Sequence, residues 1–268
     1  MGIPVPATRR TFVATAIAAA FLPAVRARAQ DNPATLAIPR PEFPWWLERH
    51  RQKLRELAQA KPRLIFIGDS IVHDFELGSP YPQYDFLSLW QRYYGDRNAV
   101  NLGFNGDSTA NVLWRLANGE MAGIAPAVAV LLIGTNNTVQ GQTAEQTQAG
   151  IDAVIATLRT GLPATRVLVV GILPSGVSPL KSAADGAVNA YLADKYAAAR
   201  DVTFVDASFG FLKDGQVDVG LFMDPRNTPP GPAIHPDAFA QARLAEVIEP
   251  ALARLLGDRA KPGTLTVP

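Results

Sequence analysis

The sequence contains no cysteine and little net charge, and beyond its N-terminus it has no long uncharged apolar run. Without thiols, disulfides, cysteine nucleophiles and thiolate metal sites are all excluded. Lysine and arginine together number 25 against 24 acidic residues, and a formal net charge of +1 offers no electrostatic footprint for nucleic acid. The three histidines lie far apart along the chain, so we expect neither a metal nor a cofactor.

The rest of the composition is that of a folded protein. The chain has 268 residues, of which 48% are hydrophobic and 18% charged, so it is too apolar for a disordered segment and can bury a core. This length suits one α/β domain or two small domains. The composition therefore favours a soluble enzyme or a binding domain.

The N-terminus has the pattern of an export signal. The paired Arg9 and Arg10 precede an apolar run at 14–24, and a small-x-small pattern ends at Ala29. We therefore predict a signal of the twin-arginine type over 1–29, leading to a periplasmic or secreted protein with no stable membrane insertion after cleavage. An uncleaved anchor helix is the alternative, although the apolar run is short for a membrane span. Removing the signal leaves 21 basic against 24 acidic residues, a net charge of −3.

The remaining chain alternates strand and helix patterns. A Pro-rich lead at 30–44 precedes a single predicted domain at 45–258, and a loose tail is expected at 259–268. This alternation predicts right-handed βαβ units, hence a five-stranded parallel sheet covered on both faces, a three-layer α/β/α sandwich. Ligands of such sheets bind beyond the carboxyl ends of the strands. The predicted strands are 64–68, 98–102, 127–133, 166–173 and 202–205, and the predicted helices are 45–60, 109–118, 144–160, 182–200 and 236–256.

Polar residues follow three of these strands directly. The first strand continues into Asp69 and Ser70, the second into Gly106, and the third into Asn136. A serine at a tight strand-to-helix turn is exposed for nucleophilic attack. A glycine lets its backbone N–H approach a ligand closely, and an asparagine amide supplies a further donor for a developing oxyanion.

These blocks, together with a late His235, resemble the SGNH or GDSL-type ester hydrolases. The stretch 106–120 is most similar to the catalytic subunits of platelet-activating-factor acetylhydrolase and their bacterial relatives. The resemblance covers about 63–256 and implies a flavodoxin-like fold. It also implies that Ser70 is the nucleophile and His235 the base. In this reading the oxyanion hole comprises the backbone N–H groups of Ser70 and Gly106 and the side chain of Asn136.

Each assignment has a plainer competitor. Asp69 and Ser70 could merely form a turn and cap a helix, although with the other blocks present we expect Asp69 to brace the turn beside a reactive Ser70. A second Gly-Asp-Ser occurs at 106–108, but its serine directly precedes a helical pattern and is better explained as a cap. Asn136 could serve only to shape a turn. Of the other histidines, we expect His50 to be solvated and His73 to line the site's mouth or decorate the surface.

The acid of a catalytic triad is not where the family places it. The position three residues before His235 is Pro232, and a Pro-rich insertion makes Asp224 the nearest preceding carboxylate. Asp224 could loop back to orient the imidazole, a main-chain carbonyl could do so in a Ser-His dyad, or the site could be inactive. Asp237 follows the histidine and fits a helix cap better.

Taken together, the sequence predicts an exported serine esterase acting on short-chain, mainly acetyl, esters through an acyl-enzyme on Ser70. The expected substrate is a small-molecule or carbohydrate ester, and the resemblance is compatible with a homodimer. A periplasmic binding module or an acyltransferase on the same fold, with a degenerate acid position, remains the alternative.

Overall fold

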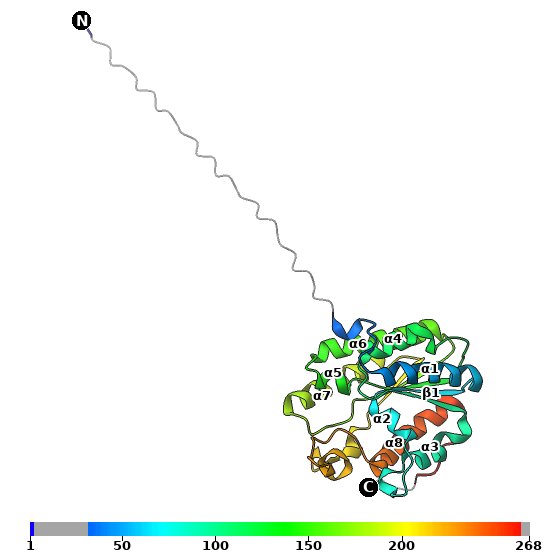
Figure 1. Cartoon of the computed structure of the whole chain (residues 1–268). Helices are drawn as coiled ribbons and strands as arrows, with labels where there is room; N and C mark the ends of the chain where they lie inside the picture. Colours follow the sequence, from blue (N-terminus) through cyan, green and yellow to red (C-terminus); the bar gives the residue numbers. More distant parts are fainter. Residues whose placement is uncertain (3–31, 264–268) are drawn as a thin grey trace. The chain divides into compact units, whose positions relative to one another are not determined.

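The computed structural model describes residues 1–2 and 32–263, so the export signal predicted over 1–29 lies outside the described residues apart from its first two (Figure 1). Among the helices of the described part, none is both long and apolar enough to cross a membrane.

The core of the domain is a five-stranded, wholly parallel sheet in the order β2-β1-β3-β4-β5. The order reverses between β1 and β3, and this is the flavodoxin-like topology whose ligands bind at the reversal. All five predicted strands are therefore confirmed. Their bounds are β1 (Leu64–Gly68), β2 (Ala99–Gly103), β3 (Val128–Leu132), β4 (Arg166–Val170) and β5 (Val202–Val205).

Helices cover both faces of the sheet, which gives the predicted three-layer sandwich. In Figure 1, α1, α4, α6 and α7 lie on one side of the sheet and α3 and α8 on the other. The helix α3 and a two-stranded hairpin of β6 and β7 had no counterpart in the sequence prediction. The helices are α1 (Pro44–Ala60), α2 (Ser70–His73), α3 (Phe86–Tyr94), α4 (Thr109–Arg115), α5 (Thr135–Val139), α6 (Ala144–Gly161), α7 (Pro179–Tyr196) and α8 (Ala238–Leu256), and the hairpin strands are β6 (Leu212–Lys213) and β7 (Gln216–Val217).

The strand sequences explain why the sheet is buried on both faces. Successive side chains of β1 point to opposite sides, so Phe66 joins the core beneath α3 and α8, while Ile65 and Ile67 join the core beneath α1, α4 and α6. Phe66 also contacts the rings of Trp90 and Tyr94 on α3 at centroid distances of 5.2 and 4.5 Å. A continuous apolar run, with no polar alternation, is what a strand needs in this position.

Both flanking segments are hydrogen-bonded to the domain, including part of the tail that the sequence predicted to be loose. In the lead, the Ala34 carbonyl accepts a hydrogen bond from Thr109 Oγ1 at 2.7 Å, and Ile38 N–H donates to the Ala110 carbonyl. In the tail, Lys261 N–H donates to Glu249 Oε1 at 2.7 Å. Residues 259–263 of the predicted tail are thus anchored rather than loose, and 264–268 lie outside the described residues.

Candidate active site

Ser70 is held at the carboxyl end of β1 by contacts from three elements. It is the first residue of α2, and Asp69 caps that helix by accepting a hydrogen bond from Ile71 N–H at 3.0 Å. The carbonyls of α2 are fixed from both sides, because Asn101 on β2 donates to Val72 O and Gln241 on α8 donates to Ile71 O. The serine therefore lies on a short, rigid turn whose position the sheet determines.

Ser70, His235 and Asp224 form one continuous hydrogen-bonded chain. Ser70 Oγ lies 3.0 Å from His235 Nε2, and His235 Nδ1 lies 2.6 Å from Asp224 Oδ1. The second oxygen of Asp224 accepts hydrogen bonds from the backbone N–H groups of Ile234 and His235 at 2.9 and 2.6 Å. Of the three arrangements that the sequence left open, the structure has the one in which Asp224 contacts the imidazole.

Backbone pairing explains how a carboxylate eleven residues upstream reaches the histidine. Met223 N–H donates to the His235 carbonyl, and Phe222 and Pro236 form an antiparallel bridge. The intervening Pro-rich segment closes on itself, since the Asp224 carbonyl accepts hydrogen bonds from both Asn227 and Gly231. The insertion is therefore a loop whose start and end are both hydrogen-bonded to Asp224.

Three carboxyl groups near the imidazole differ in their protonation. Burial acts to raise the pKa of Asp224, but hydrogen bonds from His235 and Ile234 outweigh it and hold that pKa below its ordinary value. Burial raises the pKa of Asp74, at the end of α2, to about 6, with His235 opposing the rise. Burial also raises the pKa of Asp69 to about 7, and the Oδ2 of Asp69 has no hydrogen-bond partner among the described residues. Asp224 is thus the carboxylate that stays ionised beside the histidine.

The predicted oxyanion-hole residues lie at the carboxyl ends of the neighbouring strands. Gly106 has a φ of +78°, a conformation that L side chains rarely adopt, which accounts for glycine here. Asn136, on α5 after β3, donates from Nδ2 to the Asp107 carbonyl at 2.9 Å, which ties the two loops together. Among the described residues, the backbone N–H groups of Ser70 and Gly106 donate to no other group. These two N–H groups are therefore available to a ligand.

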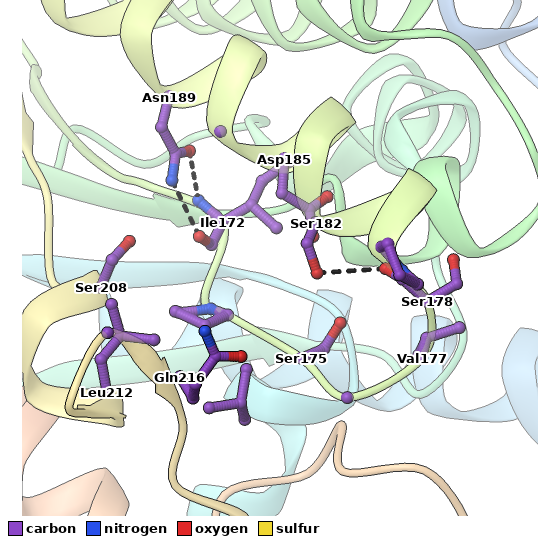
Figure 2. Close-up of a pocket in the computed structure, with 16 residues that line it drawn as sticks. Ile172, Ser175, Val177, Ser178, Ser182, Asp185, Asn189, Ser208, Leu212 and Gln216 are labelled. Atoms are coloured by element: carbon purple, nitrogen blue, oxygen red, sulfur yellow. Dashed lines mark hydrogen bonds between the residues drawn. The ribbon is translucent and has the colours of Figure 1, made fainter.

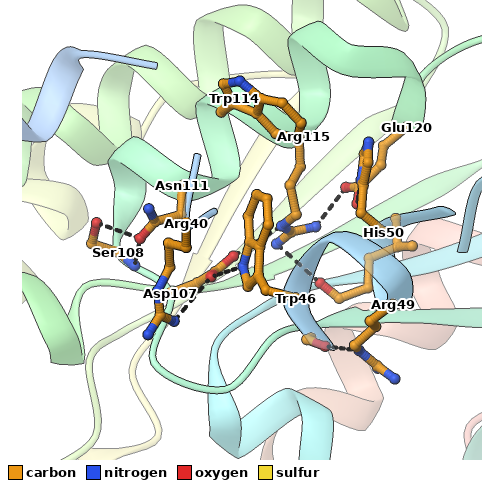
Figure 3. Close-up of polar contacts among 12 residues, drawn as sticks. Arg40, Trp46, Arg49, His50, Asp107, Ser108, Asn111, Trp114, Arg115 and Glu120 are labelled. Atoms are coloured by element: carbon orange, nitrogen blue, oxygen red, sulfur yellow. Dashed lines mark hydrogen bonds and ion pairs between the residues drawn. The ribbon is translucent and has the colours of Figure 1, made fainter. Parts of the chain in front are cut away.

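A buried charge network fixes the turn that carries Gly106 (Figure 3). The Asp107 carboxylate accepts hydrogen bonds from Trp46 Nε1 at 2.6 Å and Arg115 Nε at 2.9 Å. Arg115 Nη1 donates to Glu120 Oε2 at 2.5 Å, and Glu120 Oε1 lies 3.3 Å from His50 Nδ1. All five side chains are buried. The prediction of a solvated His50 is therefore wrong, because its ring packs against those of Trp46 and Trp114 and contacts Glu120.

Sequence analysis missed this network, although it had a signal. Arg115 directly follows the apolar run Val112-Leu113-Trp114, and Glu120 lies five residues beyond it. A cation within an apolar helix is buried only if it is paired. Arg40, from the lead, adds an outer contact to the same turn by donating to the Asn105 carbonyl at 2.7 Å.

The remaining candidates take structural positions. Ser108 is the N-cap of α4 and donates from Oγ to Asn111 Oδ1 at 2.9 Å, so the cap interpretation of the second Gly-Asp-Ser is confirmed. Asp237 caps α8 by accepting from Ala240 N–H at 2.9 Å. His73 is half-buried, stacks on Trp45 and accepts at Nδ1 from Asn105 N–H at 3.2 Å. In residues 32–263 no group of three or more His, Asp or Glu side chains is arranged to hold a metal ion.

The site joins a serine, a histidine and a carboxylate by hydrogen bonds. Beside them lie two backbone N–H groups without a partner among the described residues, at the switch point of a parallel sheet. This arrangement defines a hydrolase of the acyl-transferring class. Comparison with known proteins agrees with this class. Residues 66–243, more than half of the chain, match the model of the GDSL-like lipase/acylhydrolase family, and the chain belongs to this family. The resemblance noted in the sequence is thereby confirmed, and the protein is a GDSL-type acylhydrolase.

The curated relatives include platelet-activating factor acetylhydrolase IB subunits. The alpha2 subunit of Gallus gallus is 30% identical over 215 residues, covering 80% of this chain and 86% of the relative. The alpha1 subunit of Bos taurus is 34% identical over 196 residues, covering 70% and 78%. Both relatives align over most of their own length.

Solved structures share the fold. A GDSL-like lipase from Bacteroides thetaiotaomicron superposes with a TM-score of 0.58 at 17% identity, covering 77% of this chain and 97% of that one. A carbohydrate esterase family 3 protein from Talaromyces cellulolyticus gives a TM-score of 0.52 at 15% identity, covering 74% and 99%. At these identities the likeness concerns the fold alone.

Proposed function

We propose that the chain is an exported serine esterase that hydrolyses short-chain acyl esters, acetyl esters above all. The observation that carries the proposal is the unbroken hydrogen-bond chain from Asp224 through His235 to Ser70. Membership of the acylhydrolase family gives the reaction class. The preference for acetyl rests on relatives of 30 to 34% identity that are named acetylhydrolases.

In the proposed reaction, Ser70 Oγ attacks the ester carbonyl while His235 Nε2 accepts the hydroxyl proton. Asp224 holds the proton on Nδ1, so that Nε2 is free to act as the base, and it stabilises the imidazolium that forms. The oxyanion accepts hydrogen bonds from the Ser70 and Gly106 N–H groups and from the second N–H of the Asn136 amide. His235 then returns the proton to the departing alcohol, and a water molecule releases the acyl group from Ser70 by the same steps in reverse.

The rivals are a binding module and an acyltransferase. The case for a binding module rested on a missing acid, and the contact between Asp224 and His235 Nδ1 favours the enzyme instead. An acyltransferase would use the same acyl-enzyme but pass the acyl group to an acceptor hydroxyl. Product analysis with and without an added alcohol separates transfer from hydrolysis.

The decisive test is hydrolysis of a p-nitrophenyl acyl series, from acetyl to octanoyl, by a protein starting at Gln30. We expect turnover that is highest for acetyl and falls with chain length. Ser70→Ala should abolish this turnover, whereas Ser108→Ala, which alters the second Gly-Asp-Ser, should retain it. Equal rates in the unaltered and Ser70→Ala proteins would refute the esterase. Saturable binding of an ester without turnover would favour the binding module.

Export is a separate part of the proposal and rests on the sequence of residues 1–29 alone. Expression of the full chain in a bacterium with an active twin-arginine pathway should yield periplasmic or secreted protein beginning at Gln30. Replacing Arg9 and Arg10 by lysine should retain the precursor in the cytoplasm. A mature protein that reaches the same compartment in a strain lacking that pathway would contradict the twin-arginine assignment.

A further inference from the structure

In the proposed reaction three donors surround the oxyanion, and two of them are held by the sheet and its helices. The Ser70 N–H begins α2 at the end of β1. Asn136 lies on α5, where Thr138 Oγ1 donates to Asp185 Oδ1 at 2.7 Å. Asp185 belongs to α7 and lines a cavity of about 710 Å³ at the carboxyl end of β4 (Figure 2). The third donor, the Gly106 N–H, lies on a turn after β2, on the other side of β1, and depends on different contacts.

Gly106 is the third residue of a β-turn over 104–107. Asp107 N–H donates to the Phe104 carbonyl at 3.1 Å, and the φ of Gly106 is +78°. A positive φ at the third position, with none at the second, defines a type II turn. A type I turn has the same closing hydrogen bond and differs by a rotation of about 180° of the peptide group between its second and third residues. Glycine tolerates both conformations, so the turn's own hydrogen bond does not select between them.

The peptide group that distinguishes the two turns carries the oxyanion donor. Its N–H is that of Gly106 and its carbonyl is that of Asn105, and in a trans peptide the two point in opposite directions. The Asn105 carbonyl accepts a hydrogen bond from Arg40 Nη1 at 2.7 Å, and from no other group in the described part of the chain. Because Arg40 fixes the carbonyl on one side of the turn, it also fixes the Gly106 N–H on the other side.

The other contacts of the turn leave this peptide group free to rotate. The Asn105 N–H, which donates to His73 Nδ1 at 3.2 Å, belongs to the preceding peptide group. The buried Asp107 carboxylate lies beyond the group and holds the end of the turn. Losing the bond from Arg40 would therefore keep both ends of the turn in place and release its middle.

Arg40 is itself held in position for this bond. Its Nη1 also lies 3.6 Å from Asp107 Oδ1 (Figure 3), and its guanidinium carbon lies 4.5 Å from the centroid of the Phe43 ring. Two residues earlier, the Ile38 carbonyl accepts a hydrogen bond from Asn111 on α4 at 3.0 Å. The Arg40 side chain is only 17% exposed, so water competes little for the bond. A hydrogen bond from a charged donor is stronger than one between neutral groups.

We propose that Arg40 is a positioning residue of the active site, and that by binding the Asn105 carbonyl it keeps the Gly106 N–H directed at the oxyanion. This inference rests on the proposed esterase function and adds a residue to it. Arg40 comes from the N-terminal lead, outside the residues 66–243 that match the family model. If the peptide group rotated, the Asn105 carbonyl would take the place of the N–H. Its partial negative charge would then face the developing oxyanion.

The first experiment separates the hydrogen bond of Arg40 from its packing. Arg40→Met keeps an unbranched side chain beside Phe43 but removes every donor. It should lower kcat and kcat/KM for p-nitrophenyl acetate by the same factor, because the lost interaction acts on the transition state. We expect a factor of about 10 to 10², less than the loss of an entire donor, because some molecules keep the original orientation. Arg40→Lys, which keeps a charged donor, should recover part of the loss.

Three kinetic results would overturn the proposal. An unchanged kcat in Arg40→Met would show that the bond does not matter for turnover. A loss through KM alone would mean that Arg40 contacts the substrate instead of positioning the turn. Equal losses in Arg40→Met and Arg40→Lys would show that the donor is not what counts.

Arg63→Met is the matched control. Arg63 also donates to a backbone carbonyl, that of Leu256, at 2.6 Å and lies 3.6 Å from an aspartate, Asp258. It directly precedes β1, at the opposite end of that strand from Ser70. Arg63→Met should leave kcat unchanged, whatever its effect on the melting temperature. An equal loss of kcat in the Arg63 and Arg40 variants would indicate general destabilisation and overturn the proposal.

The second experiment observes the peptide group directly and does not depend on turnover. In a crystal structure of Arg40→Met we expect the Asn105 carbonyl to be rotated, in all or part of the molecules, while the bond from Asp107 N–H to the Phe104 carbonyl remains. The original orientation alone overturns the proposal, and so does a rotated peptide group with unchanged kcat. If the unaltered protein hydrolyses no ester, the esterase proposal fails, and the orientation of this peptide group still decides whether Arg40 holds it.

Discussion

Replacing Asp224 by asparagine should damage the enzyme more than replacing it by alanine, although asparagine is nearly isosteric. The carboxylate serves two sets of donors. One oxygen accepts from the Nδ1 side of His235 at 2.6 Å, and the other accepts two backbone N–H groups, from Ile234 at 2.9 Å and His235 at 2.6 Å. An amide has only one oxygen, so it can serve one set but not both.

The structure indicates which set the amide would serve. Facing its oxygen toward His235 Nδ1 would bring its NH₂ group against two backbone donors and leave both N–H groups without an acceptor, about 2 to 6 kcal/mol in total at roughly 1 to 3 kcal/mol each. The amide should therefore keep its oxygen on the backbone N–H groups and aim its NH₂ at Nδ1. That arrangement places the imidazole proton on Nε2, where it blocks proton transfer from Ser70.

The wrong tautomer should reduce kcat/KM by about 10³ to 10⁴, as an aspartate-to-asparagine change does in the serine-protease template. In Asp224→Ala, water can reach the half-buried Nδ1 and both tautomers are accessible, so the loss should be smaller. Hydrolysis of p-nitrophenyl acetate measures both, with circular dichroism to establish folding. Asp218→Asn is the control, because among the described residues the side chain of this nearby aspartate accepts a hydrogen bond from Gly220 N–H alone, at 3.2 Å. A folded Asp224→Asn enzyme with unaltered kcat/KM would refute the reasoning and favour a Ser-His dyad.

Three further variants test the surroundings of the triad. Gly106→Ala should reduce kcat by about 10²-fold, because a φ of +78° is strained for alanine and relaxing it turns the N–H of residue 106 away from the oxyanion; normal turnover of p-nitrophenyl acetate would contradict a role for that N–H. Trp46→Phe deletes the donor to the buried Asp107 and should lower the free energy of unfolding in urea by about 2 kcal/mol, and an unchanged urea midpoint would contradict this. Burial raises the pKa of Asp69 to about 7, so the native state keeps a proton that the unfolded chain releases, and the free energy of unfolding should fall as pH rises from about 4 to 7. Asp69→Asn, which can still accept from Ile71 N–H, should flatten that fall in melting experiments across this pH range; an unaltered slope would count against the raised pKa.

The sheet was predictable from the sequence because its determinants are local. The three central strands β1, β3 and β4 are short apolar runs that end at or just before a glycine, which is the pattern of strands buried on both faces of a parallel sheet. The positions of Ser70 and Asn136 followed from the same logic, since residues after parallel strands gather at one edge. The helix α3 was missed because its pattern is short and dominated by aromatic residues, which are typical of strands as well.

The acid could not be chosen from the sequence, because its place depends on pairing rather than on spacing. Nothing in the Pro-rich insertion reveals that Met223 pairs with His235, which is what brings Asp224 to the imidazole. His50 shows the same limit. Its partner Glu120 is 70 residues away, so a charged helical context suggested solvent where the fold places a buried contact.

The geometry of the insertion explains why the site tolerates it. One oxygen of the Asp224 carboxylate contacts the imidazole of His235, and the other accepts hydrogen bonds from the backbone that follows the insertion. The carboxylate itself therefore holds the two ends of the loop together. The hydrogen bonds from Asn227 and Gly231 to the Asp224 carbonyl bring the loop back to the residue at which it begins. The contacts that bring Asp224 to His235 therefore come from the two ends of the segment, residues 222–224 and 234–236. A fixed spacing between acid and base, as in the family pattern, is one way to bring a carboxylate to the imidazole. A loop held at both ends by the acid itself is a second.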